Sequence, residues 1–198
     1  MRGKGKFVSI EGQDGCGKTT HARLLARWLR SEGFEVVLTD EPTNGVFGKL
    51  VKKVLRGQLK LPMTAEALLF AADRVQHVRD LILPSVNAGK IVVSERYVYS
   101  SMAYQSARGL PVRWIKRINR YAPKPDLTIL IDVPTEVSSA RIGSRRLDEF
   151  ERDLGLQERV RRAYLRIARC EGLKVVNGAR SRGEVQAEIR ELVRRHVL

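Results

Sequence analysis

The stretch "FVSIEGQDGCGKTT", residues 7–20, sets an apolar run directly before three glycines, a lysine and two threonines. The run has the length of a buried strand. Residues 12–19 read G-x-x-x-x-G-K-T, the pattern of a phosphate-binding loop between a strand and a helix. Glycines let the backbone turn its amide groups toward an anion, and the following helix adds the positive end of its dipole. The stretch therefore predicts a nucleoside triphosphate site at the start of an α/β fold.

Three side chains of this loop invite separate predictions. Lys18 can reach the outer phosphates, and the Thr19 hydroxyl can complete a Mg²⁺ shell made otherwise of water and phosphate oxygen. Cys16 is either a reactive thiol or a small side chain that fills a tight turn, and the second reading is favoured. The residues predicted to bind the triphosphate are Gly12, Gln13, Asp14, Gly15, Cys16, Gly17, Lys18, Thr19 and Thr20.

Length and composition indicate a folded globular protein. Of its 198 residues, 43% are hydrophobic and 30% charged, so we expect one domain spanning residues 1–198. No apolar run approaches the roughly 20 residues that cross a bilayer, and two widely spaced cysteines suit a reducing compartment. We therefore expect a cytoplasmic protein without a membrane partner. The net charge of +15 predicts an anionic partner, either nucleic acid or a phosphorylated substrate.

Strand and helix patterns alternate along the chain. Short β-branched runs occupy residues 6–11, 34–39, 90–95, 127–132 and 173–177, and their near-continuous apolar character is that of strands buried on both faces. Apolar residues at helical spacing separate them. This alternation predicts a three-layer α/β/α fold, in which helices cover both faces of a five-stranded parallel sheet and ligands bind at the carboxyl ends of the strands.

Two further stretches suggest a second substrate site. In "LLFAADRVQHV", residues 68–78, Phe70 and Arg74 are four apart on a predicted helix and can present a ring and a planar donor group to one ligand. The alternative is a buried Phe beside a surface Arg. In "SERYVYSSMAYQ", residues 94–105, Glu95 and Arg96 follow a predicted strand, where site residues of α/β sheets collect. A structural ion pair is the alternative there.

Taken together, these stretches resemble the thymidylate kinase family. The shared motifs are the loop G-x-D-G-x-G-K-T, the Glu-Pro pair of "DEPTNG", the helix L-L-F-A-x-D-R, an acidic-Arg-Tyr triplet followed by S-x-x-A-Y-Q, the strand "PDLTILIDV", and the Arg-rich "ARIGSRRLDEFE" in place of the family's lid, at about 141–152. The resemblance implies transfer of the γ-phosphoryl group of ATP to dTMP with Mg²⁺, a P-loop kinase domain and a homodimer. No nucleic-acid partner is then expected.

The resemblance also implies a base-reading pocket. Phe70 would stack on thymine and Arg74 would bond its carbonyl. Ser101 and Gln105 would read the edge of the base, and Tyr104 would pack near the sugar. The same matching of motifs places the acceptor sugar and phosphate beside the triphosphate loop.

Asp14 would hold the 3'-hydroxyl of the deoxyribose, and Glu41 of the Glu-Pro pair would join the dTMP-binding residues. Arg96 would clamp the acceptor phosphate, and Glu95 would act with Thr19 around the metal. Lys18, Glu95, Arg96, Arg145 and Arg146 form the predicted catalytic set.

The choice of candidate lid arginines depends on the sequence of the phosphate-binding loop. The family places an Arg either in the loop or in the lid; position 15 is Gly, so Arg141, Arg145 and Arg146 are the candidates. Arg145 and Arg146 are favoured, because Arg141 falls on a helical pattern and suits an anchoring role.

The chain departs from the family pattern at several positions. Glu95 stands where Asp is usual, and Asp40 and Thr43 replace an Arg and a Gly. Lys52 could supply the missing cation. Two alternative functions remain: a kinase for another nucleotide such as dUMP, and a P-loop ATPase that binds nucleic acid.

Overall fold

The first strand, β1, lies at the centre of a parallel sheet in the computed structural model, which describes residues 5–142 and 153–198. The strands are β1 (Lys6–Glu11), β2 (Val36–Asp40), β3 (Ile91–Glu95), β4 (Leu127–Asp132) and β5 (Lys174–Asn177). Their order in the sheet is β2-β3-β1-β4-β5, with every pair parallel. The carboxyl ends of the strands therefore share one edge of the sheet, as the sequence predicts.

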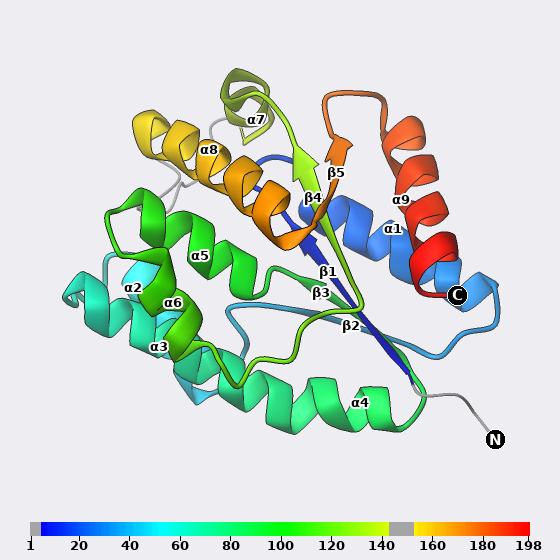
Figure 1. Ribbon diagram of the computed structural model, residues 1–198, viewed down its shortest axis with the longest axis horizontal. Helices are drawn as coiled ribbons and strands as arrows, with labels where there is room; N and C mark the ends of the chain where they lie inside the picture. Colours follow the sequence, from blue (N-terminus) through cyan, green and yellow to red (C-terminus); the bar gives the residue numbers. More distant parts are fainter. Residues whose placement is uncertain (1–4, 143–152) are drawn as a thin grey trace.

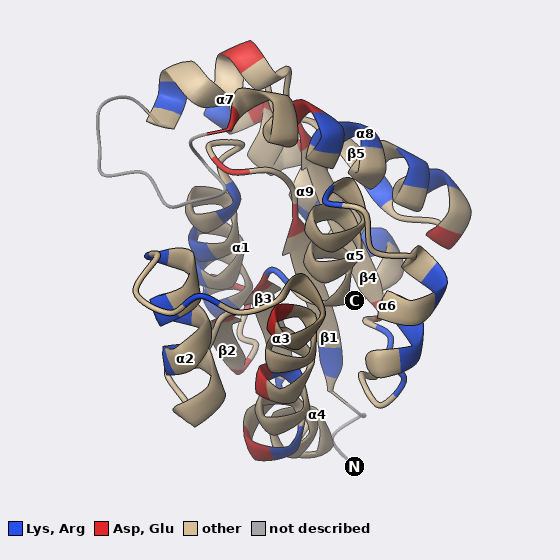
Figure 2. Ribbon diagram, turned by 90° about the vertical axis from the view of Figure 1, so that its left-hand side faces the viewer, with Lys and Arg blue, Asp and Glu red and all other residues tan. Residues whose placement is uncertain are grey.

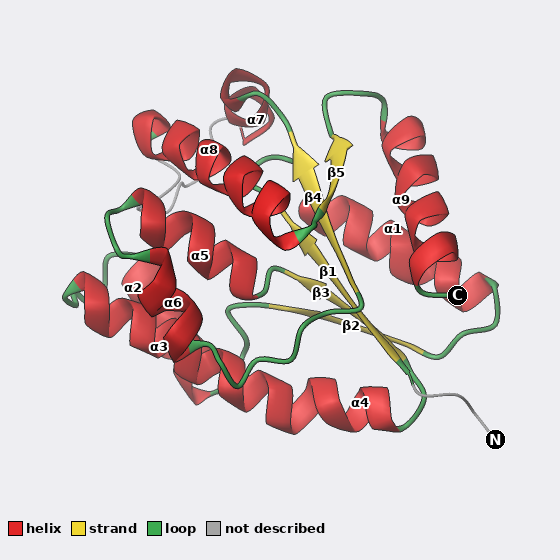
Figure 3. Ribbon diagram, in the orientation of Figure 1, coloured by secondary structure: helices red, strands yellow, loops and turns green. Residues whose placement is uncertain are grey.

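Helices cover both faces of this sheet, as Figures 1 and 3 show. The helices are α1 (Lys18–Ser31), α2 (Val46–Leu55), α3 (Met63–His77), the π-helical η1 (Val78–Ile82), α4 (Leu83–Asn87), α5 (Val98–Ala107), α6 (Val112–Ile118), α7 (Thr135–Ile142), α8 (Leu154–Glu171) and α9 (Arg182–His196). Helices α1 and α9 lie on one face, and α3, α4, α5 and α8 lie on the other. The three-layer prediction is confirmed.

Alternation along the central strands builds this arrangement. In β1, Val8 and Ile10 face the core beneath α1 and α9, whereas Phe7 packs with η1 and α4 on the opposite face. In β4, Ile129 shares the first core and Leu130 the core beneath α5 and α8. Successive side chains of a strand point to opposite faces, so both faces of a central strand must be apolar.

The prediction that all strands are buried on both faces is wrong for the two edge strands. β2 is only partly buried, and β5 is exposed along most of its length. Within the described residues, each of these two strands pairs with another strand on one side only. Their apolar residues resemble those of a central strand, so the sequence pattern does not separate the two cases.

Local sequence explains where the last helices begin and end. The Asp153 carboxylate accepts from the backbone N–H of Leu156 at 2.9 Å and caps α8, which ends at Gly172 in the left-handed region. Ser181 and Glu184 form a capping box at the start of α9. These caps fix β5 between two long helices.

Charge is distributed over many helices. Figure 2 shows Lys and Arg along α1, α2, α6 and α8, as expected for solvated helix faces. Within the described residues, no helix is both long and apolar enough to cross a membrane. That the chain forms one domain stays a prediction.

Candidate active site

A cavity of about 670 Å³ lies where β1, β2 and β3 end. The loop residues that line it are Asp14, Gly15, Gly17, Lys18, Thr19 and Thr20. The cavity is also lined by residues predicted to bind the second substrate or the metal: Glu41, Phe70, Arg74, Glu95, Arg96, Ser101, Tyr104 and Gln105. Residues from distant parts of the sequence thus meet around one cavity.

The phosphate-binding loop ends at an open helix terminus. Gly17 precedes α1 with φ 99°, and no side chain among the described residues caps this end of the helix. Lys18 is buried, and its ammonium donates to the carbonyl of Gln13 at 2.7 Å and lies 3.7 Å from the Asp14 carboxylate. Uncapped helix N–H groups and a nearby ammonium make a site for phosphate.

Three loop residues lie beneath the cavity rather than on its wall. The Gln13 amide donates to the Val133 carbonyl at 2.9 Å and to the Ser138 hydroxyl at 2.8 Å. Cys16 is buried, and burial raises the pKa of its thiol, so the reading as a turn-filling side chain is confirmed over a reactive thiol. A Cβ at Gly12 would lie 2.6 Å from Cys16 Sγ, so packing under the loop requires this glycine. Side chains of these residues face the protein, so any ligand contact would come from their backbone.

Arg96 is held from several sides at the edge of the cavity. Its backbone has φ 68°, its N–H donates to the Ile10 carbonyl at 2.9 Å, and the Ser94 hydroxyl donates to its carbonyl at 2.8 Å. Its guanidinium pairs with Asp14 and lies 5.3 Å from the centre of the Tyr104 ring. A non-glycine residue with positive φ costs free energy and marks a constrained position.

The electrostatics keep Arg96 charged. Burial alone would lower the pKa of its guanidinium, but Asp14 together with Tyr104, Tyr164 and Glu95 outweighs burial, and the pKa lies well above its ordinary value. The Tyr104 hydroxyl donates to Asp14 at 2.6 Å, and burial raises the pKa of that hydroxyl. Asp14 thus joins Lys18, Arg96 and Tyr104 in one cluster. This cluster can neutralise a phosphate placed between the two cations.

The Thr19 hydroxyl donates to Glu95 Oε1 at 2.8 Å. The two residues predicted for the metal are therefore adjacent, and both offer the oxygen ligands that Mg²⁺ prefers. Among the described residues, no group of three or more His, Cys, Asp or Glu side chains could hold a metal by itself. This donor set fits an ion that keeps its waters and binds phosphate oxygens.

The predicted base pocket is formed by α3 and α5. Phe70 is half-buried on the cavity wall, and Ser101 and Gln105 approach from α5, where both are buried. Gln105 Oε1 is buried and has no hydrogen-bond partner among the described residues. A buried amide oxygen without a donor is costly, so it is suited to accept from a ligand N–H.

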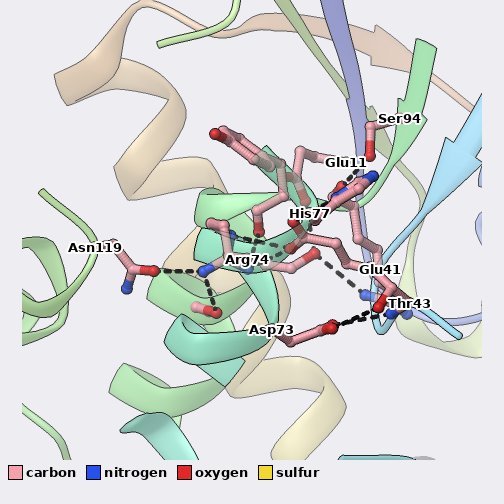
Figure 4. A network of polar contacts seen from close by, with 12 residues as sticks. Glu11, Glu41, Thr43, Asp73, Arg74, His77, Ser94 and Asn119 are labelled. Atoms are coloured by element: carbon pink, nitrogen blue, oxygen red, sulfur yellow. Dashed lines mark hydrogen bonds and ion pairs between the residues drawn. The ribbon is translucent and has the colours of Figure 1, made fainter. Parts of the chain in front are cut away.

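Arg74 is buried and does not lie free in the pocket. It donates to Glu41 Oε2 from Nε at 3.0 Å and from Nη2 at 2.6 Å, to Ser101 Oγ at 3.1 Å, to Asn119 Oδ1 at 2.6 Å and to the Tyr97 carbonyl at 3.1 Å. Asn119 approaches it from the side opposite Glu41 (Figure 4). A guanidinium has five N–H groups, so each has a protein partner. A base carbonyl could bond Arg74 only in place of one of these partners.

Neighbouring residues extend this network. His77 Nδ1 lies 3.1 Å from Glu41 Oε1, and its Nε2 lies 2.8 Å from the Thr39 hydroxyl. Asp73 accepts from the backbone N–H of Thr43 at 2.9 Å and from its hydroxyl at 2.5 Å, as Figure 4 shows. Thr43, where the family has Gly, therefore ties the Glu-Pro segment to α3.

Asp40, which replaces an Arg, and Lys52, the proposed substitute cation, lie outside the cavity wall. Burial raises the pKa of Asp40, although the Lys52 ammonium opposes this shift. The Lys52 ammonium donates to Asn44 Oδ1 at 2.7 Å, and neither Lys52 nor Asp40 lines the cavity. Direct contact between Lys52 and an acceptor phosphate therefore stays a prediction.

One lid candidate has a defined position. Arg141 lies on α7, lines the cavity and donates to the Gly178 carbonyl at 2.9 Å, and its anchoring role stays a prediction. Arg145 and Arg146 lie outside the described residues, as does most of the predicted lid at 141–152.

Several polar residues beside the cavity were not singled out by the sequence. Glu11 is fully buried at the end of β1, and Glu66 lines the cavity and pairs with Arg108. Asn119 holds Arg74 from α6's end. A carboxylate at the end of an apolar strand was a visible signal for Glu11, whereas Asn119 carried none.

Comparison with known proteins agrees with this geometry. A sequence model of the family described as thymidylate kinase matches residues 10–189. The chain is 44% identical over 202 residues to the "Probable thymidylate kinase" of Pyrococcus horikoshii and 46% identical over 202 residues to that of Pyrococcus abyssi, with 98% of each chain covered in both cases. It is 47% identical over 202 residues to the protein of the same name from Thermococcus onnurineus, with 97% of this chain and 98% of the relative covered. The chain belongs to the thymidylate kinase family.

Proposed function

We propose that the protein transfers the γ-phosphoryl group of ATP to dTMP, giving ADP and dTDP. The observation that carries this proposal is that one cavity joins an uncapped phosphate-binding loop to a pocket with a stacking ring and a buried amide oxygen that lacks a donor. Family membership supports the same reaction.

The reaction requires alignment and charge neutralisation. A phosphate monoester has a second pKa of about 6, so the acceptor is largely a dianion at neutral pH and can attack without a general base. The protein must bring two polyanions together in line and stabilise charge on the transferring group. Lys18 and Arg96 both pair with Asp14 and are the proposed cations for these two phosphates. Arg145 and Arg146 are the proposed lid cations.

Recognition of the base follows from the pocket. Gln105 Oε1 can accept the N3–H of thymine, Ser101 can bond the base edge, and Phe70 can stack on the ring. Asp14, which accepts from the Tyr104 hydroxyl, is the proposed acceptor for the 3'-hydroxyl. A purine monophosphate would present a larger ring to the same pocket.

Thr19 and Glu95 are the proposed holders of Mg²⁺, the second through water. When bound, the ion would help to neutralise the charge of the phosphates. The Thr19–Glu95 hydrogen bond holds the two side chains together on the cavity wall.

A homodimer is the proposed assembly. Exposed apolar side chains gather on two helices that pack together: Val46 and Phe47 on α2, and Leu68 and Val75 on α3. Leu68 and Val75 are seven apart and so share a face of α3. Such a patch is typical of an interface. Sedimentation velocity over a concentration series tests this assembly, and a monomer throughout would contradict it. A cytoplasmic location stays a prediction.

The reaction is tested by ADP release with ATP, Mg²⁺ and a panel of nucleoside monophosphates at two salt concentrations. We expect turnover with dTMP and much less with ribonucleotides. Turnover only with another acceptor would exclude thymidylate specificity. Hydrolysis stimulated only by nucleic acid, and lost steeply with salt, would favour a nucleic-acid-binding ATPase.

Phe70→Ala is expected to weaken dTMP binding while changing kcat little. Stacking of a base on a ring contributes about 1 to 3 kcal/mol, or roughly 5- to 150-fold in Kd. Titration calorimetry with dTMP measures the change. Phe34→Ala is the matched control, because Phe34 is 39% exposed and does not line the cavity. Equal dTMP affinity in the two variants would remove Phe70 from the base pocket.

A further inference from the structure

Glu11 is a buried carboxyl that the proposed mechanism does not use. It ends β1, directly before the phosphate-binding loop, and is 0% exposed. Its Oε2 accepts from the Ser100 hydroxyl at 2.6 Å and from the Tyr164 hydroxyl at 3.1 Å, while Oε1 is buried with no partner among the described residues. Burial raises its pKa. A half-satisfied carboxyl is costly in a core, so its position needs a reason.

Ser100 connects this carboxyl to the cavity. The Ser100 side chain lines the cavity wall, and its Oγ accepts from Arg96 Nη1 at 3.4 Å. A hydroxyl has one hydrogen and two lone pairs. Because that hydrogen is directed to Glu11, the lone pairs of Ser100 are left to accept from Arg96 and from the Tyr164 hydroxyl at 2.8 Å, whose single hydrogen is shared between Ser100 and Glu11. Glu11 therefore fixes the orientation of the Ser100 hydroxyl, so that its oxygen accepts from Arg96.

Arg96 in turn has three contacts that fix its plane. One nitrogen pairs with Asp14, another donates to Ser100, and the guanidinium carbon lies over the Tyr104 ring. Asp14 and Tyr104 are both residues predicted to touch substrate. Ser100 is the contact tied to the interior of the protein, through Glu11.

We propose that Glu11 is a positioning residue for phosphoryl transfer, which fixes the Arg96 guanidinium through the Ser100 hydroxyl. This inference rests on the proposed function, in which Arg96 holds the acceptor phosphate. Small displacements of an aligning group cost rate because the reacting atoms leave their near-attack geometry. Loss of the Glu11 acceptor should therefore lower kcat more than it raises the KM for ATP.

Four variants separate this role from a structural one. Glu11→Leu removes the acceptor, Ser100→Ala removes the bridge, and Glu11→Gln restores an acceptor oxygen in the same place. Tyr164→Phe is the control, since it removes the hydroxyl that contacts Glu11 and Ser100 but leaves the direct contacts of Arg96 with Ser100 and of Ser100 with Glu11 in place.

We expect Glu11→Leu and Ser100→Ala each to lower kcat by about tenfold, with the KM for ATP unchanged. The double variant should be no slower than either single one, because both cut the same chain of contacts. Glu11→Gln and Tyr164→Phe should stay within about twofold of the parent. A wild-type kcat in folded Ser100→Ala would overturn the proposal, as would additive losses in the double variant. Ser100→Ala carries the test if Glu11→Leu does not fold.

A second readout does not depend on turnover. ¹⁵N relaxation of the Arg96 side-chain Nε reports its mobility without any nucleotide, and we expect increased mobility in Ser100→Ala but not in Tyr164→Phe. If the parent protein fails to phosphorylate dTMP, the proposed function fails while the NMR comparison still decides whether Glu11 fixes Arg96. Equal Arg96 mobility in both variants would refute the positioning role.

Discussion

Lys18→Ala is expected to lower kcat by about 10³-fold while leaving the Kd for dTMP within about threefold of the parent value. The Lys18 ammonium is buried at the open end of α1, where the N–H groups of the helix have no side-chain cap among the described residues. Charge on the transferring phosphoryl group grows in the transition state, so a fixed cation there stabilises the transition state more than the ground state. The dTMP pocket lies on α3 and α5 and keeps its contacts.

Single-turnover kinetics and dTMP calorimetry measure these two quantities separately. Arg27→Ala is the matched control, because it removes one cation from the exposed face of the same helix. Lowering the net charge of +15 by one could by itself weaken the attraction of anions, and this variant measures that effect. A loss of only severalfold in Lys18→Ala would contradict the clamp role. A large loss of dTMP affinity would place Lys18 in acceptor binding instead.

The sequence predicted those parts of the site that depend on local pattern. The pattern of residues 12–19 predicts a strand before it and a helix after it. The spacing of Phe70 and Arg74 predicts that both lie on one face of a helix, independently of how that helix packs. That the strands run parallel follows from their alternation with helices along the chain. These features need no knowledge of distant contacts.

What the sequence could not predict are partners that only folding brings together. Glu11 meets Ser100 and Tyr164 across 89 and 153 positions of the chain. Arg74 was expected to offer its donors to a base, yet the folded chain surrounds it with protein acceptors. Side-chain type and spacing reveal which groups a residue carries, but not which of them remain available once the core has closed. The same reason explains the exposed edge strand β5, whose pattern matched a central strand.

Arg96→Ala is expected to lower kcat by about 10²- to 10³-fold. It removes a charged guanidinium, whose pKa is raised by groups that include Asp14. One nitrogen of this guanidinium pairs with Asp14 and another donates to Ser100, so the two contacts fix its plane. Arg96→Lys keeps the charge but loses this two-point geometry, because an ammonium is a point donor without a fixed plane. Lys should therefore recover only part of the loss, and we expect a kcat about tenfold or more below the parent.

The difference between the two variants separates charge from geometry. If Arg96→Lys restores the parent kcat, charge alone suffices, and alignment through Ser100 has no part in the rate. If Arg96→Lys is as slow as Arg96→Ala, alignment dominates. The lower kcat of Ser100→Ala should then also come from slower phosphoryl transfer. Rapid-quench measurement of the phosphoryl-transfer step excludes product release as the cause. Arg113→Ala, on the exposed side of α6, controls for the loss of one arginine from the surface.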